Sequence, residues 1–284
     1  MRFTKVHGAG NDFILIDACL NSGYDFRAIA PMLCHRHTGI GADGLLIAEP
    51  SASCDIRMRI INSDGSEAEM CGNGIRAFSK YAYERGLVNK QSFTVETLSG
   101  VIEPTLLLTG GNVTAVRVNM GNPLFHSADI PVAGEGNCLN RTLCVNEQTF
   151  VFSAVRVGVP HAIIEVEDPK TFAVNTIGPM IERDPLFPER INVDFYRVLD
   201  RENIEMRVWE RGAGPTLACG TGACATAVLC AANGKTERRA YVHLALDTLF
   251  IEWPTDGDVY MTGPAQIVFD GEASSQLLKT ISIQ

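Results

Sequence analysis

The feature that most constrains this chain is an internal duplication of a short glycine-rich sequence. Cys-Gly-x-Gly occurs at residues 71–74 and again at 219–222, and a helical pattern follows each copy. Both patterns end at a glycine, Gly86 or Gly234, that stands at the same offset from its cysteine. A chain duplicated in this way is expected to form two similar lobes that place two equivalent helix N-termini around one central cleft.

Short strands are predicted over most of the remaining sequence. Residues 55–61 alternate cleanly, with Ile56, Met58 and Ile60 pointing to one face. Helical periodicity is confined to 26–35, 75–85, 170–181 and 223–232, so strand and helix do not alternate regularly, which argues against a doubly wound parallel sheet. The other predicted strands are 2–6, 12–17, 92–97, 101–107, 113–118, 150–157, 162–166, 191–198, 204–208, 241–246 and 259–261.

Composition excludes several classes of protein. The chain has 284 residues, of which 46% are hydrophobic and 20% charged, so it is expected to fold around a sizeable core. A net charge of −9 disfavours nucleic acid and anionic membranes as partners, while a small-molecule substrate stays open. No apolar run has the length of a membrane span, and residues 1–6 lack a signal segment. We therefore expect a cytoplasmic protein.

The nine cysteines do not follow the spacing of a disulfide framework or a zinc cluster. Their number is odd and no Cys-x-x-Cys pair occurs. The run from Cys34 to His37 contains a cysteine and two histidines but has no second cluster nearby in the sequence, so we assign no metal site. Cys224 and Cys230 fall inside a predicted helix and are expected to pack in a core.

A Cys-Gly-x-Gly turn at the start of a helix has a definite chemical use. The first backbone N–H groups of a helix lack intrahelical partners, and the helix dipole adds positive potential there. The turn can therefore hold a carboxylate, and glycine allows its close approach. The same field is expected to lower the pKa of a cysteine at the helix entrance.

Two such cysteines, Cys71 and Cys219, suit the inversion of a stereocentre. One thiolate removes a proton from one face of a carbon, and the other thiol returns a proton to the opposite face, so no cofactor and no metal is needed. A single copy of the motif would more often be a tight turn with a buried cysteine. Two copies at matched positions favour an epimerase or racemase.

Several blocks, in order along nearly the whole chain, resemble the diaminopimelate epimerase family. They are His7-Gly-Ala-Gly-Asn-Asp-Phe13, Thr38-Gly-Ile-Gly-Ala-Asp-Gly44, Asn62-Ser-Asp-Gly-Ser-Glu67 leading to Met70–Gly74, Pro160-His161, Asn192-Val-Asp-Phe195, and Glu210-Arg-Gly-Ala-Gly214 leading to Ala218–Gly222. The family often has Asn before the Pro-His pair, where this chain has Val159, and some members have Gln where this chain has Gly44.

The resemblance implies a mixed α/β (α+β) fold of two pseudo-symmetric lobes, each a strand barrel around a central helix, with the active site in the cleft between them. We place the first lobe at residues 1–121 plus about 268–284 and the second at residues 122–267. The implied reaction interconverts LL- and meso-2,6-diaminopimelate, on the route to lysine and peptidoglycan. The implied assembly is a homodimer.

The resemblance also implies the roles of individual residues. Cys71 and Cys219 are the acid/base pair, and His161 and Glu210 lie near the cysteines and the substrate amine. The residues implied to bind substrate are Asn11 at the reacting end, Gly72, Asn73, Gly220 and Thr221 around the α-carboxylate, Asn62, Asn192 and Arg211 at the distal carboxylate, and Glu210 at the amine.

The residues themselves agree with these roles but do not require them. The fork of Arg211 suits a carboxylate, and Glu210 suits an ammonium group. Equally, these two could form a surface ion pair, and Asn62 and Asn192 could be turn residues at strand ends. Two alternatives stay open: a cofactor-independent racemase of another amino acid, such as histidine or proline, and a carboxylate-binding protein without catalysis.

Overall fold

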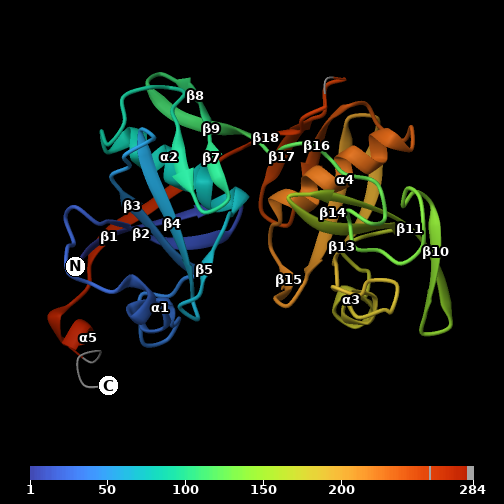
Figure 1. The fold of residues 1–284 in the computed structure, drawn as a ribbon, viewed down its shortest axis with the longest axis horizontal. Coiled ribbons are helices and arrows are strands. Elements are labelled where there is room, and N and C mark those ends of the chain that lie inside the picture. The colour runs from blue at the N-terminus through green and yellow to red at the C-terminus, as the bar shows by residue number, and fades with distance from the viewer. Residues whose placement is uncertain (256, 280–284) are drawn as a thin grey trace. The chain divides into compact units, whose positions relative to one another are not determined.

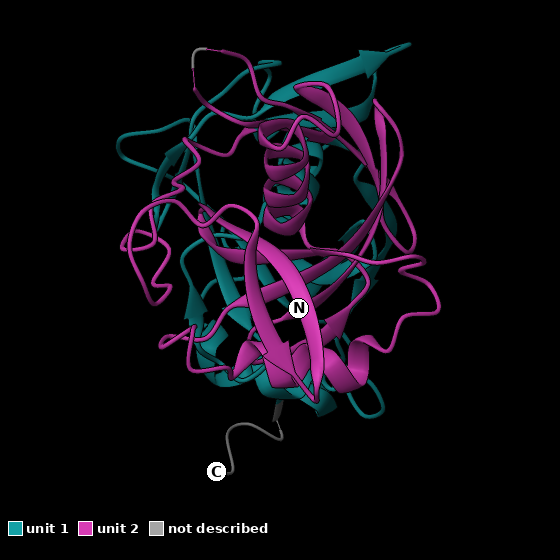
Figure 2. Cartoon of the chain, turned by 90° about the vertical axis from the view of Figure 1, so that its right-hand side faces the viewer, with its two compact units in different colours: residues 1–118, 263–284 teal, residues 119–262 magenta. Residues whose placement is uncertain are grey.

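The computed structural model describes residues 1–255 and 257–279, and it divides the chain into two compact units (Figures 1 and 2). Unit 1 comprises Met1–Val118 with Gly263–Gln284, and unit 2 comprises Asn119–Thr262. Residues 280–284, which the sequence assigns to the first lobe, lie outside the described residues. Both units combine a mainly antiparallel sheet with few helices, which confirms the predicted mixed α+β class.

The sheet of unit 1 runs in the order β19-β1-β2-β3-β4-β6-β7, with β5 paired to β4, and β8 and β9 pair antiparallel outside this order. β2 and β3 are parallel, so their first residues lie at the same edge of the sheet. The strands are β1 (Arg2–Gly8), β2 (Asn11–Asp17), β3 (Gly44–Glu49), β4 (Ile56–Asn62), β5 (Glu67–Ala68), β6 (Val95–Thr97), β7 (Gly100–Ile102), β8 (Thr105–Thr109), β9 (Asn112–Asn119) and β19 (Gln266–Glu272).

Helix α2 (Gly72–Glu84) lies along this sheet and contacts β1, β2, β3, β4 and β19. Its fully buried Arg76 donates hydrogen bonds to the Gly72 carbonyl, to Asn73 Oδ1 and to the Pro264 carbonyl, so the charge is not left unpartnered in the core. Helix α1 (Phe26–Cys34) packs on β3 and β4 around an apolar cluster that includes Ile29 and Leu33. A short helix α5 (Ser275–Lys279) follows β19.

The sheet of unit 2 runs in the order β10-β11-β12-β13-β14-β16-β17-β18, with β15 paired to β14. β12 and β13 are parallel and place His161 directly opposite Asn192. The elements are β10 (Arg141–Val145), β11 (Gln148–Val157), β12 (Val159–Glu165), α3 (Val174–Glu182), β13 (Asn192–Asp200), β14 (Asn203–Glu210), β15 (Gly214–Thr216), α4 (Gly220–Ala232), β16 (Arg239–His243), β17 (Thr248–Glu252) and β18 (Tyr260–Gly263).

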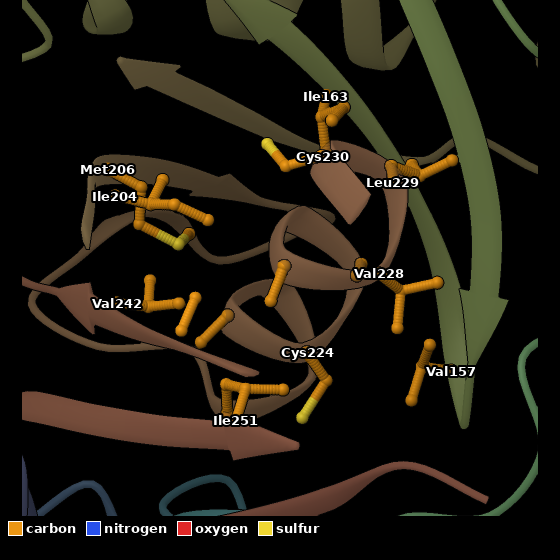
Figure 3. Packing of buried hydrophobic residues seen from close by; sticks show 14 of the residues in the cluster. Val157, Ile163, Ile204, Met206, Cys224, Val228, Leu229, Cys230, Val242 and Ile251 are labelled. Carbon is orange, nitrogen blue, oxygen red and sulfur yellow. The ribbon is translucent and has the colours of Figure 1, made fainter. Parts of the chain in front are cut away.

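Helix α4 is surrounded by the strands of its own unit, and side chains on all its faces are buried. Figure 3 shows Val228, Leu229, Cys224 and Cys230 pointing from the helix toward apolar side chains of the surrounding strands. A helix enclosed in this way needs no polar face, which explains its apolar composition. The prediction that Cys224 and Cys230 pack in a core is confirmed, because neither side chain is exposed.

The principal helix predictions are confirmed, but some strand boundaries are wrong. The predicted strand 101–107 is two strands, β7 and β8, separated at Glu103 and Pro104, because proline has no N–H for the ladder. The predicted strand 241–246 ends at His243. Strands β5, β10, β15, β17 and β19 were not predicted. No helix within residues 1–255 and 257–279 has the length and apolar character needed to cross a membrane.

Candidate active site

Cys71 is the N-cap residue of α2. Its backbone is extended, with φ −143° and ψ 115°, and its sulfur accepts a hydrogen bond from the Gly74 N–H at 3.3 Å. This is the geometry of an N-cap side chain that satisfies the N–H three residues into the helix. Gly72 and Asn73 therefore occupy the first turn, where backbone N–H groups have no intrahelical carbonyl to bond. The predicted helix entrance is confirmed.

Cys219 caps α4 in the same way. Its φ of −128° and ψ of 111° are close to those of Cys71, and its sulfur accepts from the Gly222 N–H at 3.4 Å. Both helices span thirteen residues, and both are followed by a glycine, Gly86 or Gly234, with a φ of +71°. The duplication seen in the sequence is therefore a duplication of structure at both ends of the helix.

The second glycine of each motif lies in close packing, more tightly at Gly222 than at Gly74. A Cβ at Gly74 would lie 3.2 Å from Leu46 Cδ2 and 3.5 Å from the Cys71 sulfur. A Cβ at Gly222 would lie 2.5 Å from Asp194 Oδ1, closer than carbon and oxygen can approach. Glycine at these positions lets the helix start lie against the cysteine in one unit and against a buried carboxylate in the other.

Asn11 is the side chain that meets the Cys71 thiol within unit 1. The Cys71 sulfur donates to Asn11 Oδ1 at 3.4 Å, and Asn11 Nδ2 donates to Asp43 Oδ2 at 2.7 Å. Asn73 is buried, and its side-chain oxygen accepts from Arg76. Asn62 ends β4 and donates to Ser66 Oγ within its own turn.

Cys219 stands at the end of a chain of hydrogen-bonding side chains in unit 2. Its sulfur lies 3.3 Å from Thr221 Oγ1, and that hydroxyl lies 2.9 Å from His161 Nε2. His161 Nδ1 lies 2.7 Å from Asp194 Oδ2. His161 and Asp194 are both fully buried. The chain can move a proton between the thiol and the imidazole through one hydroxyl.

Glu210, at the end of β14, completes the surroundings of Cys219. Its carboxylate accepts a hydrogen bond from Thr216 Oγ1. Burial raises the pKa of Glu210, and the bond from Thr216 opposes that rise. A carboxyl group of this kind can exchange protons closer to neutral pH than an exposed glutamate.

The expectation of a lowered cysteine pKa is wrong for Cys219. Burial raises its pKa well above the ordinary value, and the nearby charges of Glu210 and Asp194 add to that rise. The bond from the Gly222 N–H lowers the pKa but is outweighed. The helix field is a local effect that the sequence reveals, whereas the desolvation comes from the enclosing sheet.

Asn192 lies opposite His161 on the neighbouring strand. Both the NH2 group and the oxygen of its side-chain amide form hydrogen bonds with backbone groups. Nδ2 donates to the Pro160 carbonyl at 2.8 Å, and Oδ1 accepts from the Arg211 N–H at 2.8 Å. Arg211 is exposed, and its guanidinium donates to the Glu189 carbonyl at 3.1 Å. In this structure Asn192 therefore fixes the turn that carries Arg211.

The sequence analysis predicted no role for two acidic residues, Asp43 and Asp194. Asp43 accepts a hydrogen bond from Asn11, and Asp194 pairs with His161. Both lie within the family-like blocks. Asp194 follows Asn192 by two residues on a strand, and this spacing, which places both side chains on one face, was the available signal. Across residues 1–255 and 257–279, no group of three or more His, Cys, Asp or Glu side chains is placed to hold a metal ion.

A family model described as diaminopimelate epimerase matches residues 3–126 and 153–268. The diaminopimelate epimerase of Moorella thermoacetica is 52% identical over 275 residues, covering 96% of this chain and 99% of the relative. That of Caldanaerobacter subterraneus subsp. tengcongensis is 51% identical over 273 residues, with the same coverage of both chains.

Solved structures with lower identity share the fold. A hydroxyproline epimerase from Agrobacterium vitis superposes with a TM-score of 0.70 at 14% identity, covering 95% of this chain and 91% of that chain. A phenazine biosynthesis protein of the PhzF family from Bacillus anthracis superposes with a TM-score of 0.69 at 16% identity, covering 96% and 99%.

Proposed function

Because the chain belongs to the diaminopimelate epimerase family, we propose that it interconverts LL- and meso-2,6-diaminopimelate with Cys71 and Cys219 as the acid/base pair. The observation that carries this proposal is the pair of matched helix entrances, each capped by a cysteine sulfur. Carboxylate binding at helix N-termini needs no cofactor, and neither does proton transfer by thiols.

The reaction balances with these groups alone. One sulfur, as thiolate, takes the α-hydrogen as a proton, and the electron pair of the C–H bond passes to the α-carbon and its carboxylate. The opposite thiol then gives its proton to the other face of that carbon. The enzyme ends with the proton on the first sulfur and the thiolate on the second, so the reverse reaction uses the same groups in exchanged roles.

His161 and Asp194 provide a way to deprotonate Cys219. A carboxylate has no hydrogen to donate, so His161 Nδ1–H donates to Asp194, and Nε2 of the neutral ring accepts from the Thr221 hydroxyl. The Thr221 oxygen is then free to accept the thiol proton. We propose that the proton leaves Cys219 through Thr221 to His161, which offsets the high pKa of this thiol.

Substrate binding is assigned to the predicted residues around these groups. The α-carboxylate lies over the N–H groups of Gly72, Asn73, Gly220 and Thr221, where the helix dipoles stabilise the charge that grows as the proton leaves. Asn11 contacts the reacting end, and Glu210 accepts from the ammonium group. Arg211 and Asn62 hold the distal carboxylate. Asn192 contributes by fixing the turn of Arg211.

The test follows the stereocentre directly. Purified protein is incubated with LL-diaminopimelate in D2O, the meso product is measured by chiral chromatography, and deuterium at the α-carbon is measured by mass spectrometry. We expect conversion in both directions, with deuterium in the product. Cys71→Ser and Cys219→Ser should each abolish conversion. Full activity in both variants would exclude the two-thiol mechanism.

The second candidate is a racemase of another amino acid, and two observations favour testing it. Val159 replaces the family's polar residue before Pro160, and a hydroxyproline epimerase has the same fold. Proline and histidine are therefore offered at the same concentration as diaminopimelate. If proline or histidine is racemised faster than diaminopimelate is epimerised, that amino acid is the substrate, and the two-thiol mechanism still applies. Binding without deuterium exchange would indicate a carboxylate-binding protein.

The remaining assignments follow from the proposed reaction. An enzyme that forms meso-diaminopimelate serves lysine and peptidoglycan synthesis, and we therefore propose a cytoplasmic location. A homodimer is proposed from the family resemblance. Sedimentation equilibrium across a hundredfold range of concentration tests this, and a constant mass of one chain, 30.8 kDa, would exclude the dimer.

A further inference from the structure

Asp43 is an acidic residue to which the proposed mechanism gives no role. It lies immediately before β3, and Asn11 is the first residue of β2. Because β2 and β3 are parallel neighbours, both residues lie at the same edge of the sheet, beside the start of α2. Asp43 Oδ2 accepts from Asn11 Nδ2 at 2.7 Å and from the Asp12 N–H at 3.1 Å.

The chemistry of these contacts fixes which end of the Asn11 amide faces Cys71. A carboxylate accepts hydrogen bonds and has none to donate, so only the NH2 end of Asn11 can face Asp43. The carbonyl end is then the one that faces the Cys71 sulfur at 3.4 Å. A carbonyl oxygen accepts from a thiol but repels a thiolate, so this orientation favours the protonated form of Cys71.

Asp43 is itself held in place. Arg36 donates to Asp43 Oδ1 at 2.7 Å and also to both carboxylate oxygens of Asp12, which in turn accepts from Lys5. The backbone N–H of Asp43 donates to the Asp12 carbonyl at 2.9 Å. The Asp12 N–H holds Oδ2, the oxygen that faces Asn11, while Arg36 pairs with the other oxygen, Oδ1.

We infer that Asp43 is a positioning residue that orients the Asn11 amide so that its carbonyl oxygen faces Cys71. The inference rests on the proposed function for its relevance to catalysis, because Asn11 and Cys71 act at the substrate there. It gives the unliganded enzyme a defined state, in which Cys71 carries its proton and is ready to act as the acid.

The test measures the reactivity of Cys71 with iodoacetamide at a series of pH values. The peptide that contains Cys71 is quantified by mass spectrometry, with the exposed Cys19 as the reference within the same chain. In Asp43→Ala, the freed Asn11 amide can turn its NH2 group toward the sulfur and stabilise the thiolate. We expect the pH of half-maximal alkylation to fall by about one unit, the equivalent of one hydrogen bond.

Asp43→Asn separates orientation from charge. Both variants remove the negative charge, but an asparagine at position 43 keeps an oxygen at the site that faces two donors, Asn11 Nδ2 and the Asp12 N–H. In Asp43→Asn, the pH of half-maximal alkylation of Cys71 should fall by less than half of the fall in Asp43→Ala. Equal shifts in the two variants would overturn the inference, because the effect would then come from the lost charge.

An Asn11→Ala background is the second test. If Asp43 acts through Asn11, Asp43→Ala should shift the alkylation profile by no more than a few tenths of a unit in that background. A full shift there would overturn the inference. Arg36→Met is the matched control, because it breaks ion pairs of Asp43 and leaves the Asn11 bond. It should not move the profile to lower pH.

Turnover distinguishes failure of the inference from failure of the proposed function. With diaminopimelate, Asp43→Ala should lower kcat by about tenfold, and Asp43→Asn should recover to within about threefold of wild type. In the Asn11→Ala background, Asp43→Ala should cause little further loss. If wild type does not epimerise diaminopimelate, the proposed function fails. The alkylation profiles of the Asp43 and Asn11 variants would still decide whether Asp43 orients Asn11.

Discussion

His161 Nδ1 lies 2.7 Å from Asp194 Oδ2, and neither side chain reaches solvent. The two residues come from the adjacent parallel strands β12 and β13, so the sheet itself fixes their separation. Since an ionised carboxylate can only accept, this pair determines the tautomer of the imidazole, and the tautomer determines whether Nε2 can accept a proton from Thr221.

Asp194→Asn should therefore impair catalysis without unfolding the protein. The new amide can donate to Nδ1, which reverses the tautomer and leaves Nε2 as a donor toward Thr221. We expect kcat to fall by about 100-fold, a typical contribution of one acid/base group. The measurement is the initial rate of conversion of LL-diaminopimelate, with thermal unfolding as the control for folding. A rate within threefold of wild type would contradict the proposed proton path.

Thr221 offers a matched pair of variants. Thr221→Ser keeps the hydroxyl between Cys219 and His161, whereas Thr221→Val keeps the shape and removes it. We expect the serine variant to stay within about threefold of wild-type kcat and the valine variant to lose about 10- to 100-fold. Equal activity of the two variants would show that no proton passes through this hydroxyl, whichever level of activity they share.

The helix entrances were predictable from sequence because their signals are local. Cys71 and Cys219 stand directly before glycine-rich helix starts, and Gly86 and Gly234 stand where the helices end, both with a φ of +71°. Capping geometry depends on residues within four positions of one another, so a short motif and a helical pattern suffice to locate it. The duplication strengthened the prediction by providing each signal twice.

The residues behind the cysteines were not predictable in the same way. Asp43 meets Asn11 only because β2 and β3 pair in parallel, and Asp194 meets His161 only because β12 and β13 do. These two parallel pairings join residues more than 30 positions apart: 32 for Asn11 and Asp43, and 33 for His161 and Asp194. The raised pKa of Cys219 was missed for the same reason, since the enclosing sheet causes it.

Glu210 should make the stability of the protein depend on pH in a defined direction. Its pKa in the folded protein is raised by burial above the ordinary value of 4.5. The folded state thus binds this proton more tightly than the unfolded state, and the resulting stabilisation is complete below pH 4.5 and is lost as pH rises through the folded pKa. Removing the carboxyl group should remove this dependence.

Glu210→Gln is the corresponding experiment. The free energy of unfolding is measured with urea at pH 5 and pH 8 for both proteins, and the difference, Glu210→Gln minus wild type, should be more positive at pH 8. Groups that do not interact with Glu210 titrate equally in both proteins and cancel in the comparison. A difference that is unchanged or more negative at pH 8 would contradict a raised pKa.

Gly222 is expected to be the glycine of α4 at which substitution harms catalysis most. In Gly222→Ala, the new methyl group would meet Asp194 Oδ1 at 2.5 Å and His161 Cε1 at 3.3 Å, so the buried pair must move. Gly234→Ala is the matched control at the other end of the same helix, where the positive φ disfavours alanine but no atom lies within 4 Å. The control should lose about 1 kcal/mol of unfolding free energy and keep its kcat.

Gly222→Ala should lose at least about tenfold in kcat, because a displaced catalytic group of this kind costs one to two orders of magnitude. Urea unfolding and initial rates on both variants separate the two effects, and a Gly222→Ala enzyme with wild-type kcat would mean that the His161–Asp194 geometry does not matter for turnover.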